Sequence, residues 1–324
     1  MICLGIESTA HTFGIGIVKD KTILANIKDT YTTKKGGMEP IKVKEHHEKV
    51  QEKVLTEALK KAKLNIDEID IIAIANAPGL APALLVGMNF AKELAKKHYK
   101  PLISVNHVCA HLEIGRMITK TKDPIFVFVS GANTQIIAHE GGRYRIFGET
   151  LSIALGNALD KFGRIIGLGF PSGPKIEQMA KKGKYVELPY VVKGMDVDFS
   201  GIITKAESLY KKGIKPEDLC YSLQETCFAM LTEVTERALA HCEKDEVILI
   251  GGVAANKRFC KMLDDMCNDR GAKFKPVPLE YCGDNGAMIA WTGILKHKIG
   301  IKEDIKNIDI KPRQRIDEIK AEWF

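Results

Sequence analysis

Two histidines four positions apart, His107 and His111, are the residues best suited to hold a metal ion. They follow an apolar run at 102–105, and Asn106 suits an N-cap, so a helix beginning there places both imidazoles on one face. Two imidazoles so placed can share a divalent metal, although a hydrogen-bonded pair in a polar cleft fits the spacing equally well. Asp284, in a small-residue turn before an apolar helix, is our candidate third ligand; its alternative role is to cap that helix.

The same motif argues against a zinc peptidase. Peptidases of the His-Glu-x-x-His type need a glutamate beside the first histidine as general base. Val108 occupies that position, and no carboxylate lies between the two histidines. The sequence therefore disfavours this class of enzyme.

Small polar turns directly after apolar runs are candidate phosphate-binding elements, because their backbone N–H groups can hold phosphate oxygens. One such turn spans residues 7–12 and another spans 130–134. Two turns could hold a polyphosphate or an adenylate from opposite sides. A glycine-rich turn at 251–256 adds a place for a nucleotide, although close helix–strand packing is on its own the stronger explanation there. The polar or titratable members of the first turn are Glu7, Ser8, Thr9 and His11.

The elements that must position these turns occur twice. The first set comprises apolar runs at 2–6, 13–18 and 70–75 and a helix near 88–97. The second comprises runs at 125–129, 135–138, 144–147 and 246–250 and a helix near 257–266. The repeat predicts two α/β lobes of related design with a ligand cleft between them, the alternative being two unrelated βα segments. Amphipathic helices are also expected at 43–62 and 221–241.

The domain prediction places residues 1–122 and 292–324 in the first lobe and 123–291 in the second, with a polar tail from about residue 300 returning to the first. At 324 residues and 45% hydrophobic composition, the chain is long enough for two cores. An uncharged stretch at 71–91 is interrupted by Pro and Gly, which disfavours a membrane span.

The remaining composition favours a soluble cytoplasmic protein. The chain opens on a strand-like run, from which we expect no signal peptide. Its eight cysteines form no Cys-x-x-Cys pair, which indicates a reducing compartment. A net charge of +7 permits binding of a polyanion but does not identify which one. Most of the basic pairs suit solvated helix faces. The basic clusters, whose alternative role is to contact tRNA, lie at Lys34-Lys35, Lys60-Lys61, Lys96-Lys97-His98-Lys100, Lys181-Lys182-Lys184 and Lys211-Lys212.

Five motifs in this order resemble the universal tRNA threonylcarbamoyltransferase family, in its archaeal and eukaryotic branch. They lie at residues 4–12, 106–111, 130–135, 251–256 and 283–288. Further similar stretches at 147–150, 189–196, 199–201 and 315–323 extend the resemblance over essentially the whole chain. Five ordered motifs at matching spacing are far more specific than any one alone.

The resemblance implies a two-lobed actin/Hsp70-like fold, an α/β architecture with duplicated mixed sheets. It implies transfer of threonylcarbamoyl from threonylcarbamoyl-AMP to the adenosine beside the anticodon in tRNAs reading codons that begin with A. One divalent metal per subunit, iron first and zinc second, is expected on His107, His111 and Asp284, besides ATP or threonylcarbamoyl-AMP with magnesium. The implied nucleotide-site residues are Phe128, Val129, Ser130, Gly131, Ala132, Asp160, Gly173, Glu177 and Asn256.

The implied partners are tRNA and the KEOPS subunits, namely a small protein kinase and a small dimerising subunit that contacts the first lobe. Two other classes stay open. A small-molecule kinase of the actin-like superfamily shares the lobes but usually opens on an Asp turn and gives His107 and His111 no role. A nucleotide-gated scaffold would bind ATP without transferring anything. The chain departs from the family pattern at Ser8, Ala77, Ala81, Leu85, Phe128, Ala132 and Ser172.

Overall fold

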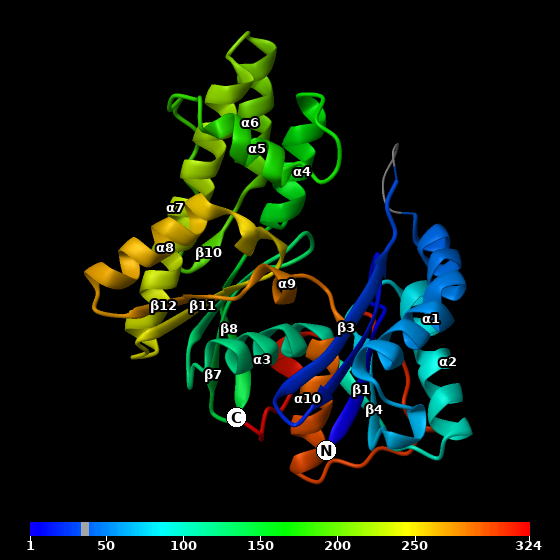
Figure 1. Cartoon of the computed structure of the whole chain (residues 1–324). Helices are drawn as coiled ribbons and strands as arrows, with labels where there is room; N and C mark the ends of the chain where they lie inside the picture. Colours follow the sequence, from blue (N-terminus) through cyan, green and yellow to red (C-terminus); the bar gives the residue numbers. More distant parts are fainter. Residues whose placement is uncertain (34–38) are drawn as a thin grey trace. The chain divides into compact units, whose positions relative to one another are not determined.

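The computed structural model describes residues 1–33 and 39–324, which form two compact units (Figure 1). Unit 1 comprises Met1–Met117 and Gly283–Phe324, and unit 2 comprises Ile118–Cys282. The expected basic cluster Lys34-Lys35 lies outside the described residues.

Unit 1 is built on a five-stranded sheet in the order β3-β2-β1-β4-β5. Strand β1 pairs antiparallel with β2 and parallel with β4; β2–β3 is antiparallel and β4–β5 parallel. Its central strands are apolar on both faces, as a sheet covered on both sides requires. The strand bounds are β1 Ile2–Glu7, β2 Thr12–Lys19, β3 Thr22–Thr30, β4 Ile71–Ala77 and β5 Leu102–Asn106.

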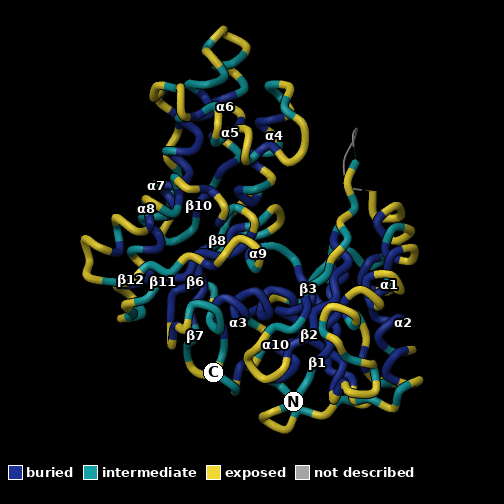
Figure 2. The backbone as a smooth tube through the Cα atoms, in the orientation of Figure 1, coloured by how far each residue is buried: buried dark blue, intermediate teal, exposed yellow. Residues whose placement is uncertain are grey.

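Helices cover this sheet, and one of them makes direct backbone contact with it. A Cβ added at Gly5 of β1 would lie 2.2 Å from the backbone nitrogen of Ala290 in α10, so only glycine permits this approach. Figure 2 shows α10 and α3 largely in dark blue. The helices of unit 1 are α1 Pro40–Ala62, α2 Ala81–Lys97, α3 His107–Thr119 and α10 Gly286–Lys298, with 3-10 turns η1 Ile66–Glu68 and η3 Ile316–Glu318.

Several observed boundaries differ from those expected, and the first unit's opening segment ends at Met117 rather than at residue 122. The second unit ends at Cys282 rather than near residue 291, because α10 packs on β1 and β2 of unit 1. Helix α2 begins at Ala81 rather than near residue 88, because Pro82 lies in its first turn, where a missing N–H costs nothing. Within α2, only glycine fits at position 87, because a Cβ there would lie 1.9 Å from the Ser8 hydroxyl.

Unit 2 contains a second five-stranded sheet, in the order β12-β11-β6-β7-β8. Strand β6 pairs antiparallel with β7 and parallel with β11; β7–β8 is antiparallel and β11–β12 parallel. This is the pairing pattern of unit 1, so the predicted duplication of the sheets is confirmed. The strands are β6 Ile125–Val129, β7 Thr134–Glu140, β8 Arg143–Glu149, β11 Glu246–Ile250 and β12 Lys273–Pro276, with a small ribbon of β9 Val192–Lys193 and β10 Asp196–Val197.

The helices of unit 2 include the expected amphipathic one. Helix α7 begins at Pro216, ahead of residue 221, again with a proline in its first turn. The helices are α4 Leu155–Ile165, α5 Gly173–Ala180, α6 Ser200–Lys211, α7 Pro216–His241, α8 Lys257–Asp269 and α9 Leu279–Cys282, with the 3-10 turn η2 Gly252–Ala255. Among residues 1–33 and 39–324, no helix has the length and apolar character needed to cross a membrane.

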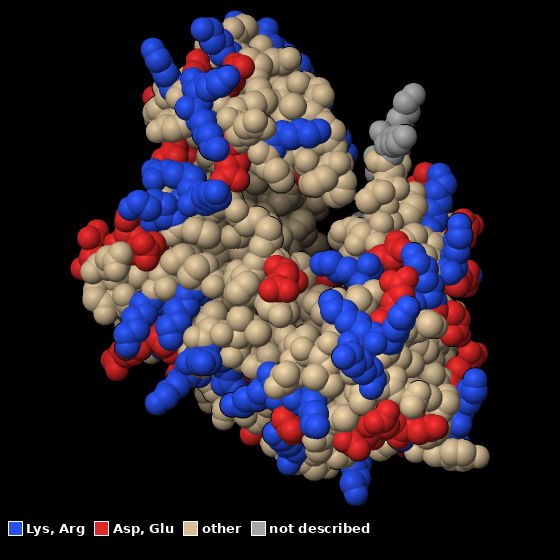
Figure 3. Space-filling model, in the orientation of Figure 1, with Lys and Arg blue, Asp and Glu red and all other residues tan. Residues whose placement is uncertain are grey.

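Several basic clusters coincide with the last turns of helices. Lys60 and Lys61 end α1, and Lys96 and Lys97 end α2. Cations there interact favourably with the negative end of the helix dipole, so these clusters have a structural explanation. Figure 3 shows acidic and basic side chains interspersed over the viewed surface of each unit.

Candidate functional site

The two candidate histidines lie at the start of α3, where β5 ends. The side chain of Asn106 accepts a hydrogen bond from the Cys109 backbone N–H at 3.1 Å, which confirms the predicted N-cap. The cap sets the first turn of α3, and one turn further on His111 follows His107 on the same face. Their ring centroids are 4.6 Å apart at an interplanar angle of 84°.

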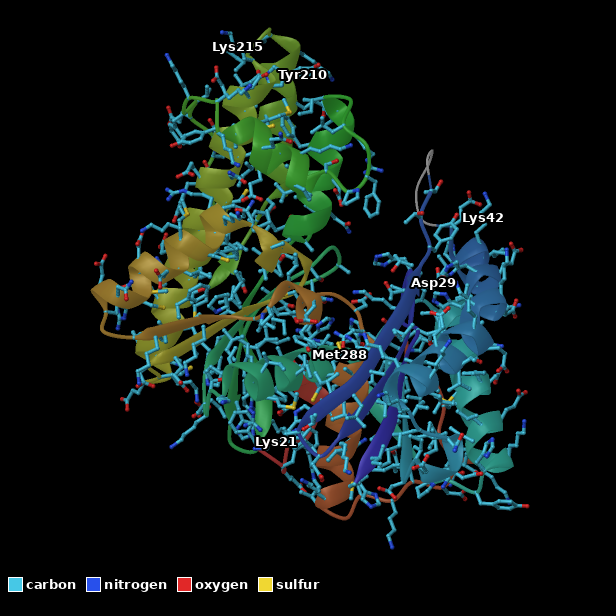
Figure 4. All side chains as sticks on the ribbon, viewed as in Figure 1. Lys21, Asp29, Lys42, Tyr210, Lys215 and Met288 are labelled. Carbon is cyan, nitrogen blue, oxygen red and sulfur yellow. The ribbon has the colours of Figure 1, made fainter. Side chains whose placement is uncertain are left out.

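Asp284 meets both imidazoles from the loop before α10. Its Oδ1 lies 3.5 Å from His107 Nε2 and 3.3 Å from His111 Nε2. Asn285 caps α10 instead, accepting from the backbone N–H of Met288, which Figure 4 labels. The capping alternative for Asp284 is therefore wrong, because the neighbouring residue performs that task.

The spacing of these three donors fits a metal ion. One ligand atom from each lies within 4.8 Å of the others. Ligand atoms about 2.0–2.1 Å from a tetrahedral ion are separated by about 3.3 Å, close to the observed separations from Asp284. His111 is buried and His107 and Asp284 are only slightly exposed, so the three donors are largely withdrawn from solvent.

A buried carboxylate supports His107 from behind. Glu7, at the end of β1 and fully buried, accepts from His107 Nδ1–H at 2.9 Å. The other Glu7 oxygen accepts from the Thr9 backbone N–H at 2.7 Å and from its hydroxyl at 2.5 Å. This hydrogen bond orients the His107 ring so that Nε2 faces Asp284, and Nε2 is the nitrogen that would lose its proton when an ion binds, as in carboxylate–histidine pairs of metal sites.

Electrostatics in the site follow from this arrangement. Burial alone would lower the pKa of His107, but the charges of Glu7 and Asp284 outweigh it and raise the pKa to about 9. Burial lowers the pKa of His111. Burial would raise the pKa of Asp284, but the His107 and His111 charges hold it below its usual range. Two carboxylates thus create a site of negative charge that favours a cation.

The rest of the first turn is packed into the protein. Ser8 is fully buried against α2, and the Thr9 carbonyl accepts from the Leu80 N–H at 2.8 Å. His11 is half-buried, and its charge contributes to the lowered pKa of Asp284. The sequence pattern predicts a phosphate turn here and does not reveal the support that Glu7 gives to His107. A carboxylate ending an otherwise apolar strand was the available signal.

In unit 2, hydrogen bonds and close approaches connect most of the candidate nucleotide residues around the ends of β6 and β11. Phe128 and Val129 are buried in β6, whereas Gly131 and Ala132 in the next turn are exposed. The Ser130 carbonyl accepts from the Gly156 N–H at 3.2 Å, which joins this turn to the start of α4. Since β6 and β11 are parallel, the turns that follow them lie at one edge of the sheet, where α/β proteins commonly bind ligands.

Three further candidates continue this edge. Asp160 in α4 accepts from the Ser172 N–H at 2.6 Å, next to Gly173 at the start of α5. Glu177 in α5 accepts from the Lys257 N–H at 2.9 Å, which is adjacent to Asn256. A Cβ added at Gly173 would meet nothing within 4 Å, so the surface there is open.

Asn256 has a structural role in this edge. Its Oδ1 accepts from the Arg258 and Phe259 N–H groups as the N-cap of α8, and its Nδ2 donates to Gln224 at 2.7 Å. Gly251, at φ 99°, approaches the Val129 carbonyl so closely that a Cβ would lie 2.3 Å from it. Close packing therefore accounts for this glycine, as the alternative for the 251–256 turn predicted.

Comparison with known proteins identifies the family. Residues 22–291 match the family model described as "TsaD: tRNA N6-adenosine threonylcarbamoyltransferase". A protein named tRNA N6-adenosine threonylcarbamoyltransferase from Thermococcus sibiricus is 54% identical, and its namesake from Archaeoglobus fulgidus 50%, each over the whole of both chains. A Methanobrevibacter smithii protein named as a probable bifunctional tRNA threonylcarbamoyladenosine biosynthesis protein is 51% identical over this whole chain and 60% of its own length.

Solved structures show the fold alone. Thermococcus kodakarensis HypF superposes with a TM-score of 0.64 at 15% identity, over 90% of this chain and 47% of HypF. The activator of 2-hydroxyisocaproyl-CoA dehydratase from Clostridium difficile, with bound ADPNP, gives 0.54 at 12% identity, over 94% of this chain and 99% of the activator. These likenesses and the duplicated sheets confirm the actin-like α/β fold. From the family match and the full-length relatives, the chain belongs to the tRNA N6-adenosine threonylcarbamoyltransferase family and is a transferase.

Proposed function

We propose that this chain transfers the threonylcarbamoyl group of threonylcarbamoyl-AMP to the amine of the adenosine beside the anticodon, in tRNAs that read codons beginning with A. The adenine amine attacks the carbamoyl carbonyl, a C–N bond forms, and the bond from that carbon to the phosphate oxygen breaks. AMP leaves with the electron pair, and the amine loses one proton. The mixed anhydride is already activated, so orientation of the two substrates is the main task of the protein.

The observation that carries this proposal is the buried group of His107, His111 and Asp284, supported by Glu7. Its two imidazole nitrogens and one carboxylate oxygen suit iron, our first candidate, or zinc. A bound divalent ion supplies Lewis acidity toward a carbonyl or phosphate oxygen. The protein residues hold the donors in place. Glu7 accepts a hydrogen bond from His107 Nδ1–H, so the Nε2 atom of His107 faces Asp284.

For the nucleotide, we propose the edge of the unit 2 sheet where β6 and β11 end. The exposed turn at Gly131 offers backbone N–H groups, and the open surface at Gly173 leaves room for an adenine or ribose. Asp160 and Glu177 each use one carboxylate oxygen in a backbone hydrogen bond. Their other oxygens are suited to accept from ribose hydroxyls. The ligand would be ATP or threonylcarbamoyl-AMP, with magnesium neutralising the phosphates.

Protein partners and the compartment complete the proposal. The Methanobrevibacter smithii relative is named bifunctional, and this chain covers 60% of it, which supports a second activity fused there. In this chain we assign that activity to separate KEOPS subunits, a small protein kinase and a small dimerising subunit that contacts unit 1. The eight cysteines are free thiols, which suits the cytoplasm, where tRNA is also modified.

A reconstituted reaction tests the function. The metal-loaded chain, its partner subunits, threonylcarbamoyl-AMP and unmodified tRNA should yield threonylcarbamoyladenosine, detected by mass spectrometry of digested tRNA, together with AMP. Phosphorylation of a small sugar or acid without modified tRNA would instead establish the kinase alternative. Nucleotide binding with neither product would establish the scaffold alternative.

A further inference from the structure

The C-terminal tail of unit 1 follows the elements that lead to the metal-binding helix. Glu303 accepts from both the backbone N–H and the hydroxyl of Ser104 in β5, at 2.7 and 2.6 Å. The Lys311 N–H then donates to the Asn76 carbonyl at the end of β4, at 2.8 Å. These contacts lead the tail along the sheet toward α3.

The last two residues of the tail, Trp323 and Phe324, contact α3 itself. Trp323 Nε1–H donates to Glu113 Oε1 at 2.8 Å, and Arg116 Nε donates to the other oxygen of Glu113 at 3.2 Å. The Arg116 guanidinium lies 3.7 Å from the centre of the Phe324 ring, a cation–π arrangement. Glu113 is fully buried, so its charge depends on such partners for stabilisation. We call Trp323, Phe324, Glu113 and Arg116 the tail clamp.

The tail clamp holds α3 from the side opposite its histidines. Each helical residue advances about 100°, so Glu113 projects roughly 200° away from His111, on the other side of the helix axis. It is about 3 Å further along that axis, less than one turn from the second imidazole. The start of α3 is fixed independently, by the Asn106 cap and by Glu7 on His107. His111 therefore lies between a fixed start and a clamped end.

We propose that Trp323 is a positioning residue for the metal site, which sets the distance of His111 from Asp284 by clamping α3. The proposal rests on the proposed metal site and not on the transfer reaction. A metal site tolerates deviations of about 0.2 Å in ligand distance, so even a small tilt of α3 would weaken it. Groups behind a ligand typically contribute about 10- to 100-fold to metal affinity, although they touch no metal.

The test replaces Trp323→Phe, which keeps an aromatic ring but removes the N–H that Glu113 accepts. Glu322→Gln, at the exposed neighbouring position, is the matched control. Cobalt(II) is titrated into metal-free protein, because its visible absorption reports ligand geometry, and affinity is measured by competition with a chelator. Thermal melting of the metal-free proteins records stability separately.

We expect Trp323→Phe to lower cobalt affinity about tenfold and to change the absorption bands, while metal-free melting stays close to that of the control. Unchanged affinity and bands would overturn the proposal. The proposal would also be overturned if the variant bound cobalt less tightly but kept the wild-type absorption bands, and if its metal-free protein were less stable to the same extent. That combination indicates general destabilisation of the fold.

A metal-free measurement keeps the tail clamp testable if wild-type protein binds no cobalt, an outcome that would refute only the metal site. Amide hydrogen exchange is compared for α3 and α10 in wild-type protein and Trp323→Phe. Faster exchange in α3 residues 111–117 with unchanged α10 supports the clamp. Equal exchange in α3 overturns it.

Discussion

The turns that follow β1 and β6 occupy the same place in two sheets of the same topology, yet their environments are opposite. At the end of β1 and directly after it, Glu7, Ser8 and Thr9 are all buried. After β6, Ser130 is half-buried and Gly131 is exposed. The fold thus provides one position twice, and burial decides which groups of that position are available for chemistry.

In unit 1, where the turn is buried, side chains are the groups available for chemistry. A buried carboxylate is costly unless it is hydrogen-bonded, and Glu7 is held by Thr9 and His107. In unit 2, the Ser130 hydroxyl accepts from the Asn133 N–H within its own turn, at 3.0 Å. That local bond leaves the neighbouring backbone exposed to a ligand. We infer that the same turn serves a metal site in unit 1 and a nucleotide in unit 2.

Removing a metal ligand should have the largest effect on unit 1. His111→Ala is expected to reduce bound metal from about one ion per chain to background, because two donors hold an ion far less tightly than three. Elemental analysis of purified protein gives the ratio, and circular dichroism checks the fold. His98→Ala, which removes a half-buried histidine paired with the exposed Asp67, is the control. Metal retained at the wild-type ratio would refute the site.

Substitutions in the two equivalent turns test the comparison directly. Glu7→Gln should weaken metal affinity about 10- to 100-fold, since the amide no longer accepts as a carboxylate from His107 Nδ1–H. Ser130→Ala, in the turn that follows β6 in unit 2, should leave metal affinity unchanged. Chelator competition measures both. Equal effects of the two variants would show that the turns do not differ as proposed.

Nucleotide affinity should change when residues of unit 2 are substituted. Gly173→Trp is expected to weaken ATP binding about tenfold or more, roughly 1.4 kcal/mol, because the ring fills the open surface there. Gly201→Trp adds the same ring at another open helix start and should change little. Calorimetry measures affinity in both. If the two variants bind alike, the nucleotide lies elsewhere.

Asn256→Ala requires a different interpretation. The change removes the N-cap of α8 and the bond to Gln224, so a loss of about 1 kcal/mol of stability is expected whether or not a nucleotide contacts Asn256. Affinity should therefore be compared at a temperature where thermal melting shows the variant fully folded. An affinity loss that persists there would support a direct contact. Wild-type affinity there would assign Asn256 to structure alone.

The repeated fold could be predicted from the sequence because it depends on local patterns. Apolar runs, polar turns and helical periodicity each involve a few neighbouring residues, and they recur in both halves. The start of α3 was equally local, because Asn106 precedes the helix that it caps. The N-cap of α10 was less clear, since Asp284 and Asn285 are both good capping residues. Only the chain path shows that Asn285 caps, which leaves Asp284 to face the imidazoles.

Contacts between distant residues could not be predicted in this way. Glu7 and His107 are 100 positions apart, and Trp323 and Glu113 are 210 apart. Glu7 could support His107 or belong to a phosphate-binding turn, and no local sequence pattern distinguishes these two roles. The expected starts of α2 and α7 were displaced for a related reason, because a proline near a helix start resembles a proline in a loop.

A pH-dependent effect on stability concerns the support of the first turn by α1. His47 is fully buried, its Nε2–H donates to the Ala10 carbonyl at 2.9 Å, and its ring packs edge-on against Phe13. Burial, together with the charges of His46 and His11, lowers the pKa of His47 to about 4. The neighbouring His46 donates from Nε2–H to the Asp29 carboxylate at 3.0 Å, and Figure 4 labels Asp29 on β3.

The direction of the pH dependence follows from the lowered pKa. The unfolded chain protonates His47 near pH 6.5, whereas the folded protein resists protonation down to about pH 4. The stabilising contribution is therefore complete above pH 6.5 and is lost as pH falls toward 4. Between pH 7 and 5 the loss is at most about 2 kcal/mol.

His47→Gln keeps an N–H for the Ala10 carbonyl but does not titrate, so its stability should fall less over this range. Native-state hydrogen exchange of β1 and β2 amides, in metal-free protein at both pH values, measures the difference. Parallel losses in wild type and variant would show that His47 does not hold the turn as a neutral donor.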